Sequence, residues 1–187
     1  MSKRSSKFER SGKDFYPTPY EAVIPLFRHL PFRKATYYEP CVGTGHLIKH
    51  LSEHAICVGH SDLFHYNDDN MWSALKNACT TQYETGADYF ITNPPWDRKL
   101  LHPIIENLSN QKPTWLLFDA DWMHTKQAIP YLKRCTLIVS VGRVKWFPES
   151  KMTGFDNVCW YKFAHTDPKR FRAAAWPIFC PRTDNMG

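Results

Sequence analysis

Long apolar runs are missing from this sequence of 187 residues. No stretch approaches the roughly 20 apolar residues that a membrane-spanning helix needs, so we expect no such helix. No targeting segment is recognisable either, and we expect a cytoplasmic protein. Internal repeats and low-complexity tracts are also absent, which argues against solenoid and fibrous architectures. The length fits one globular domain.

Cysteine pairs of the metal-binding kind are absent too. The six cysteines form no C-x-x-C pair and have no histidines at zinc-finger spacing. A chain of this length buries enough surface to fold without cross-links, so we expect reduced thiols. His46, His50 and His54 share a face of a predicted helix, but no Glu-x-x-His arrangement accompanies them. We interpret these histidines as surface residues and predict no metal site.

Acidic residues are fewer than basic ones, 18 against 24, which gives a net charge of +6. Residues 1–13 alone carry a net charge of +4, from five basic side chains and Glu9. We expect a disordered arm there that is attracted to nucleic-acid phosphates, although a solvated terminus that aids solubility is the alternative. Aromatic residues make up 15% of the chain and either fill the core or stack on flat ligands.

Hydrophobic periodicity predicts alternating strands and helices, which is typical of a parallel α/β domain. Thr18 is placed to cap the first helix, with Pro19 at its first position. Residues 65–87 are predicted to be irregular, apart from a helix at 71–78. Residues 142–156 form a predicted loop, and residues 164–187 an irregular tail. Strands are predicted at 35–38, 55–59, 88–92, 115–118, 137–141 and 158–163, and helices at 20–30, 46–54, 100–108 and 125–133.

A glycine loop, residues 39–45 (EPCVGTG), joins the first predicted strand to a helix. It lacks the third glycine of the G-x-G-x-x-G dinucleotide fingerprint and the Gly-Lys-Ser/Thr of a Walker loop. Its glycines allow a ligand to approach the backbone, and Glu39 suits a cationic group such as an α-ammonium rather than a phosphate. Asp62, after the second strand, can accept hydrogen bonds from two ribose hydroxyls. The alternatives are that the glycine loop is only a structural turn and that Asp62 is a surface acid or a helix cap.

The most informative motif is Asn93-Pro94-Pro95-Trp96, at the end of the predicted strand 88–92. The prolines fix the backbone and leave carbonyls without partners in the sheet. An exocyclic amine on an aromatic ring is a poor nucleophile because its lone pair is delocalised. The Asn93 side-chain oxygen and the Pro94 carbonyl could hold its two N–H groups, while Trp96 stacks on the ring for about 1–3 kcal/mol. A proline-rich turn with a core tryptophan is the alternative.

These motifs, in this order, resemble the class I S-adenosylmethionine-dependent methyltransferases, specifically the type that methylates the N6 amine of adenine in DNA. The resemblance covers residues 14–163 as a catalytic domain. It implies a Rossmann-like α/β fold with a mostly parallel sheet and an antiparallel last strand, and S-adenosylmethionine as cofactor. It also implies a cofactor site formed by Tyr16, Thr18, Glu39, Pro40, Cys41, Gly43, Gly45, Asp62 and Asn93, and a target-base site formed by Asn93, Pro94 and Trp96.

Two departures from the family pattern leave questions open. The acidic residue that usually follows a third strand has no clear equivalent, only Asp68, Asp69 and Glu84 as loose candidates. The chain also has no room for a separate target-recognition domain. The predicted loop offers Arg143, Lys145, Lys151 and Thr153 for phosphate contacts, beside Trp146, Phe147 and Met152, which could support a flipped base. A solvated hairpin loop is the alternative.

Other substrates remain compatible with the motif at residues 93–96. Enzymes that methylate an RNA base amine, or a glutamine amide in proteins, carry similar residues. A non-catalytic nucleic-acid-binding module on the same scaffold is a further alternative. Methylation at cytosine carbon-5 would need a Pro-Cys nucleophile, but Pro40-Cys41 lies in the predicted cofactor loop. A compact enzyme of this kind would suit a phage, and its oligomeric state is left open.

Overall fold

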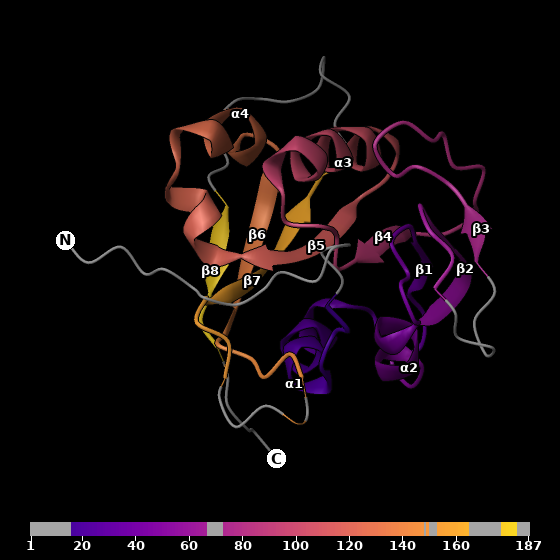
Figure 1. Cartoon of the computed structure of the whole chain (residues 1–187), viewed down its shortest axis with the longest axis horizontal. Helices are drawn as coiled ribbons and strands as arrows, with labels where there is room; N and C mark the ends of the chain where they lie inside the picture. The colour runs from indigo at the N-terminus through magenta and orange to yellow at the C-terminus, as the bar shows by residue number, and fades with distance from the viewer. Residues whose placement is uncertain (1–15, 67–72, 148, 150–152, 165–176, 183–187) are drawn as a thin grey trace.

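The computed structural model describes residues 16–66, 73–147, 149, 153–164 and 177–182 (Figure 1). A mixed sheet of eight strands, in the order β3-β2-β1-β4-β5-β7-β6-β8, forms the centre. Among these strands only β7 runs antiparallel to its neighbours. The strands are β1 (Thr36–Glu39), β2 (Ile56–Asp62), β3 (Ala74–Leu75), β4 (Tyr89–Thr92), β5 (Thr114–Asp119), β6 (Cys135–Gly142), β7 (Val158–Phe163) and β8 (Ile178–Cys180).

Helices cover both faces of this sheet, with α3 and α4 on one side and α1 and α2 on the other (Figure 1). Successive residues of the central strands point to opposite faces, so Phe90 and Leu116 pack with α3 while Ile91 and Leu117 pack with α1 and α2. The result is a three-layer α/β domain with two cores. The helices are α1 (Tyr20–Val23), η1 (Ile24–His29), α2 (His46–Leu51), α3 (Arg98–Gln111), η2 (Ala120–His124), η3 (Lys126–Ala128) and α4 (Ile129–Leu132), where η marks a 3₁₀ helix.

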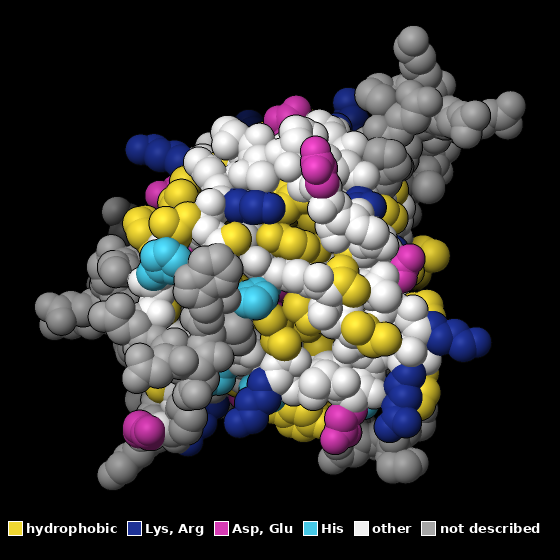
Figure 2. Space-filling model, turned by 90° about the vertical axis from the view of Figure 1, so that its right-hand side faces the viewer, with side chains coloured by type: hydrophobic (Ala, Val, Ile, Leu, Met, Phe, Trp, Pro, Cys, Tyr) yellow, Lys and Arg dark blue, Asp and Glu magenta, His cyan; other side chains and the backbone are white. Residues whose placement is uncertain are grey.

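The sheet edge formed by β2 and β3 is less well covered. Ile56, Val58 and Leu75 are 54%, 49% and 58% exposed, because no helix lies between β2 and β4 in the described residues. Figure 2 views the molecule from this side, where apolar side chains lie among scattered Lys and Arg. Within the described parts of the chain, no helix is both long and apolar enough to cross a membrane.

The predicted fold class is confirmed, but several predicted elements differ from the structure. The strand after residue 62 is β3, whose two residues are too few to produce a periodic pattern. The helix predicted at 71–78 is wrong at residues 74–75, which form this strand. The predicted irregular tail contains β8, which pairs in parallel with β6 beyond the antiparallel β7. The basic arm at 1–13 lies outside the described residues.

Two further predicted helices are interrupted, and each contains a proline. Pro25 lies at the start of η1, which takes the place of residues 24–29 of the first predicted helix, and Pro130 lies in α4, which follows η3 where one helix was predicted at 125–133. The predicted helix cap is also wrong. Pro19 takes the N-cap position, and Thr18 instead accepts a hydrogen bond from Asn93.

Candidate active site

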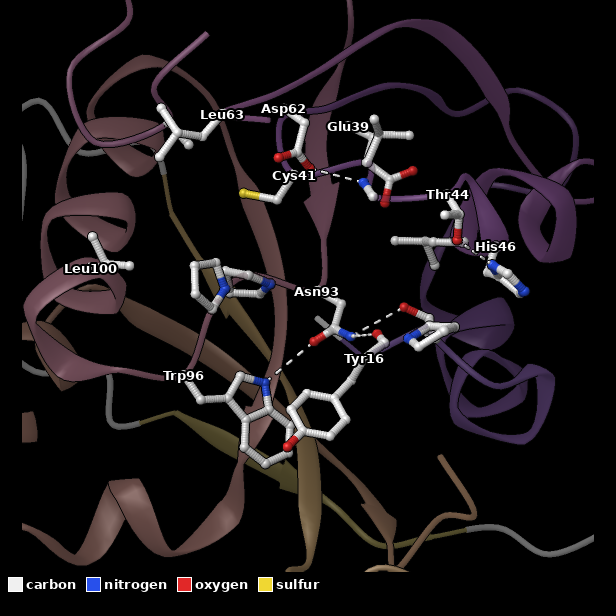
Figure 3. Close-up of a pocket in the computed structure, with 18 of the residues that line it drawn as sticks. Tyr16, Glu39, Cys41, Thr44, His46, Asp62, Leu63, Asn93, Trp96 and Leu100 are labelled. Atoms are coloured by element: carbon white, nitrogen blue, oxygen red, sulfur yellow. Dashed lines mark hydrogen bonds between the residues drawn. The ribbon is translucent and has the colours of Figure 1, made fainter. Parts of the chain in front are cut away.

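The predicted motifs meet around a cavity of about 750 Å³ at the carboxyl ends of β1, β2 and β4 (Figure 3). Parallel α/β sheets bind ligands at this edge because the loops that follow neighbouring strands converge there. Residues 16–18, 146–147 and 153–156 line the cavity on its other sides. Its described lining includes four carboxylates and no Lys or Arg, so the cavity suits a ligand with cationic and apolar parts.

The glycine loop turns the chain sharply between β1 and α2. Gly43 and Gly45 have φ angles of 54° and 77°, a region that residues with a Cβ rarely adopt. The amide of Val42 donates to the carbonyl of Ser61, which holds the loop against the end of β2. Gly43 lines the cavity, whereas Gly45 is buried behind it as the N-cap of α2. Gly45 therefore shapes the loop rather than touching the cavity.

Glu39 is the last residue of β1 and is only 1% exposed. Its Oε2 atom is buried without a hydrogen-bond partner, which is costly for a charged oxygen. Burial, and next the nearby Asp62, raise the pKa of the Glu39 carboxyl well above its usual range. A cationic ligand group in the cavity would supply the missing partner.

Asp62 is the last residue of β2 and is 7% exposed. Its carboxylate accepts from the amide of Gly43 at 2.9 Å and from the amide of Phe64 at 3.1 Å. These two bonds fix the carboxylate at the cavity wall. Each oxygen keeps a further lone pair, so Asp62 can still accept hydrogen bonds from a ligand.

Asn93 follows β4 and points into the cavity (Figure 3). Its Nδ2 atom donates to the carbonyl of Tyr16 and to the hydroxyl of Thr18, both at 3.2 Å. Its Oδ1 atom accepts from the indole N–H of Trp96 at 3.3 Å. The amide is therefore held on both sides, and its oxygen keeps one lone pair for a ligand.

Aromatic rings from three segments surround this asparagine. Trp146 meets Trp96 edge to face at a centroid distance of 5.4 Å, and Tyr16 meets Trp146 at 5.9 Å. Phe147 also packs on Tyr16 at 5.9 Å. A Cβ added at Gly154 would lie 3.1 Å from the Trp146 ring, so the glycine lets the loop fold closely over the indole. These rings give this side of the cavity an aromatic wall on which a flat ligand could stack.

The structure brings most of the predicted site residues together and separates others. Arg143 is exposed, and neither it nor Lys145 lines the cavity, while Lys151 lies outside the described residues. The backbone amide of Lys145 donates to Glu21 instead. Those that line the cavity are Tyr16, Thr18, Glu39, Pro40, Cys41, Gly43, Asp62, Asn93, Pro94, Trp96 and Thr153.

Sequence reasoning missed the cavity wall beyond Asp62. Tyr66 and the turn at 77–79 line it, whereas Glu84 is exposed and lies elsewhere, and Asp68 and Asp69 are outside the described residues. Asn77 holds the turn by accepting from the amide of Cys79 at 2.9 Å. An asparagine followed by small residues was the available signal, but it is common in ordinary turns.

The interpretation of the three helix histidines also needs correction. His46 is exposed at the cavity, but His54 is half-buried and packs on Phe27 at a centroid distance of 3.6 Å. His50 meets Tyr20 edge to face. Within the described residues, no three His, Cys, Asp or Glu side chains gather as a metal ion would require.

Comparisons with solved structures identify the architecture. A candidate RNA methyltransferase from Pyrococcus horikoshii superposes with a TM-score of 0.58 at 14% identity, covering 86% of this chain and 92% of its own. The chain has the class I methyltransferase fold. A dimethyladenosine transferase from Plasmodium falciparum has a TM-score of 0.51 at 19% identity, with 80% and 62% covered. A type I restriction-modification methyltransferase subunit from Streptococcus thermophilus has a TM-score of 0.50 at 10% identity, with 80% and 44% covered.

Comparisons of the sequence alone found no relative. No protein-family model and no curated protein sequence matches the chain. At identities this low, the structural likeness establishes the fold and not the reaction.

Proposed function

We propose that the protein is an S-adenosylmethionine-dependent methyltransferase that methylates the exocyclic N6 amine of adenine in DNA. One observation carries the proposal: the oxygen of Asn93 lies in the same cavity as the glycine loop, Glu39 and Asp62. A methyl donor and an amine acceptor can therefore meet in one space. The class I methyltransferase fold supports the same reaction type.

The cofactor side of the cavity fits S-adenosylmethionine chemically. Its α-ammonium group would partner the buried Oε2 of Glu39, and its ribose hydroxyls would donate to Asp62. Pro40, Cys41 and Gly43 would line the cofactor, with Tyr16 and Thr18 near its methionine part. The cofactor, when bound, supplies an electrophilic methyl group on a sulfonium.

The target side would bind and orient the amine. Asn93 Oδ1 and the Pro94 carbonyl would each accept one N–H of the amine, which favours a pyramidal nitrogen with its lone pair directed at the methyl group. Trp96 would hold the base by stacking, and the surrounding rings would exclude water. Catalysis on this account is positioning and electrostatics, without a covalent enzyme intermediate.

DNA is the favoured polymer, and RNA is the second candidate. The order of the motifs resembles that of enzymes acting on DNA, while the Pyrococcus horikoshii neighbour, a candidate RNA methyltransferase, supports RNA. Because no Lys or Arg is in the described cavity lining, phosphate contacts would come from residues outside it. The basic residues 1–13, Arg143, Lys145 and Lys151 are the candidates, with Thr153 at the cavity edge.

The proposal can be tested by incubating the full chain with cofactor and either unmethylated DNA or an RNA transcript. Nucleoside mass spectrometry would then identify the product. We expect N6-methyladenine from DNA. Product from RNA alone would move the proposal to the second candidate, and a protein that binds the cofactor but methylates neither polymer would contradict both.

A further inference from the structure

The side-chain amide of Asn93 has a specified orientation. An acceptor that cannot donate, the carbonyl of Tyr16, faces its nitrogen, and a donor that cannot accept, the indole N–H of Trp96, faces its oxygen. Turning the amide over would set oxygen against carbonyl and N–H against N–H. Figure 3 shows the bonds on the two sides of Asn93, one set from segment 16–18 and one from Trp96.

The segment on the nitrogen side is itself rigidly placed. Thr18 is 5% exposed, and Pro17 and Pro19 restrict the backbones of the residues before them, Tyr16 and Thr18. The helix that follows is tied to the sheet, because the indole N–H of Trp160 donates to the carbonyl of Ala22 at 2.7 Å. The acceptors of this segment, 75 and 77 residues away from Asn93 in sequence, are therefore held at fixed positions.

We infer that residues 16–18 form a positioning strap: the Tyr16 carbonyl fixes which end of the Asn93 amide faces the target amine, and the Thr18 hydroxyl, which can bond to either end, holds the amide in place. The inference rests on the proposed function and adds a role for Thr18 beyond contact with the cofactor. Without the hydroxyl, the amide loses one of its two nitrogen-side acceptors. A turned amide would present its own N–H groups to the target amine, donor against donor.

Three variants separate this role from others. Thr18→Val keeps the shape of the side chain and removes the acceptor, whereas Thr18→Ser keeps the acceptor. Thr80→Val is the matched control, because Thr80 is exposed and does not line the cavity. Each protein is measured for single-turnover methyl transfer to the polymer that the wild type labels, for cofactor affinity by calorimetry, and for the Asn93 side-chain amide signals in a ¹⁵N-edited spectrum.

We expect Thr18→Val to slow methyl transfer about tenfold, the effect of losing one hydrogen bond. Its cofactor affinity should fall less than its rate, because the contact with the cofactor is only one of Thr18's two roles, and its Asn93 amide signals should shift. Thr18→Ser should recover most of the rate, and Thr80→Val should match the wild type in all three measurements.

Other outcomes overturn the inference. One is a Thr18→Val protein with wild-type rate and unchanged Asn93 signals. Another is a rate loss fully accounted for by weaker cofactor binding, which would make Thr18 a cofactor contact only. A wild-type protein that binds the cofactor but methylates neither polymer overturns the proposed function, and the inference about residues 16–18 is then overturned as well.

Discussion

The two halves of the cavity are built in different ways. The cofactor half, around Glu39, Gly43 and Asp62, lies where two neighbouring strands end, and the amides of Val42 and Gly43 donate to the end of β2. The target half combines segments far apart in the chain, namely residues 93–97, 146–147 and 153–156, held largely by aromatic contacts, and residues 16–18 border both halves. The position of the cofactor half therefore follows from the sheet itself, whereas the target half depends on contacts between loops that are distant in sequence. Substitutions in the two halves should therefore have separable effects.

The largest effect is expected at Asn93. Asn93→Ala removes the proposed acceptor for the target amine and should reduce methyl transfer by about 100- to 1,000-fold, as the loss of a preorganised polar group does elsewhere. Cofactor affinity should change only a few-fold, because Asn93 lies on the target side. Single-turnover rates and calorimetry measure the two quantities. A near-normal rate for this variant would contradict the role of Asn93 as acceptor for the target amine.

Asp62→Ala should have the opposite effect from Asn93→Ala, with a large loss in cofactor affinity. It removes the anchor of Gly43 and the proposed ribose contact, so we expect cofactor affinity to fall by about 10- to 100-fold. Asp88→Ala is a demanding control, since Asp88 accepts from the amide and hydroxyl of Thr36 at the opposite end of β1. It should lower stability without weakening cofactor binding. Equal affinity losses in both variants would contradict the assignment of Asp62.

Glu39 gives a pH dependence with a definite sign. Its folded-state pKa is raised, so its contribution to stability is present below the ordinary carboxyl pKa and is lost as the pH rises through the folded-state value. Glu39→Gln should therefore raise the melting temperature at pH 8 more than at pH 5, with about 2–4 °C for each kcal/mol. Thermal unfolding at both pH values checks this, with the exposed Glu53→Gln as control.

The Glu39 carboxyl should also make cofactor binding depend on pH. Binding of an ammonium group favours the charged carboxylate, so cofactor affinity should rise with pH and binding should release a proton. Calorimetry in buffers of different ionisation enthalpy measures that proton. Proton release that is unchanged in Glu39→Gln would assign it to another group.

The smallest effect is expected at Gly154. A methyl group there would press on the Trp146 ring, so Gly154→Ala should raise the KM for the polymer by about two- to fivefold, within the roughly 1 kcal/mol of a small packing change. Cofactor affinity should stay constant. Gly86→Ala is the matched control, because a Cβ at Gly86 meets no atom within 4 Å. A loss of cofactor affinity in Gly154→Ala would show that the two halves are not separable.

The same difference explains what the sequence could predict. The central strands, the glycine loop and Asp62 follow from local patterns, because each motif lies directly after its strand. The bond between Thr18 and Asn93 could not be predicted, since it joins segments 75 residues apart and replaces a helix cap that local rules favour. The turn at 77–79 and β3 were missed because both are too short to produce periodicity. The site roles themselves remain predictions.

A crystal structure with S-adenosylhomocysteine and an adenine-containing oligonucleotide tests the central claim most directly. We expect the ligand's amino group at Glu39, its ribose at Asp62, and an adenine amine within hydrogen-bond distance of Asn93 Oδ1, on a line toward the sulfur. A cofactor product bound outside this cavity, or an adenine placed away from Asn93, would contradict the account.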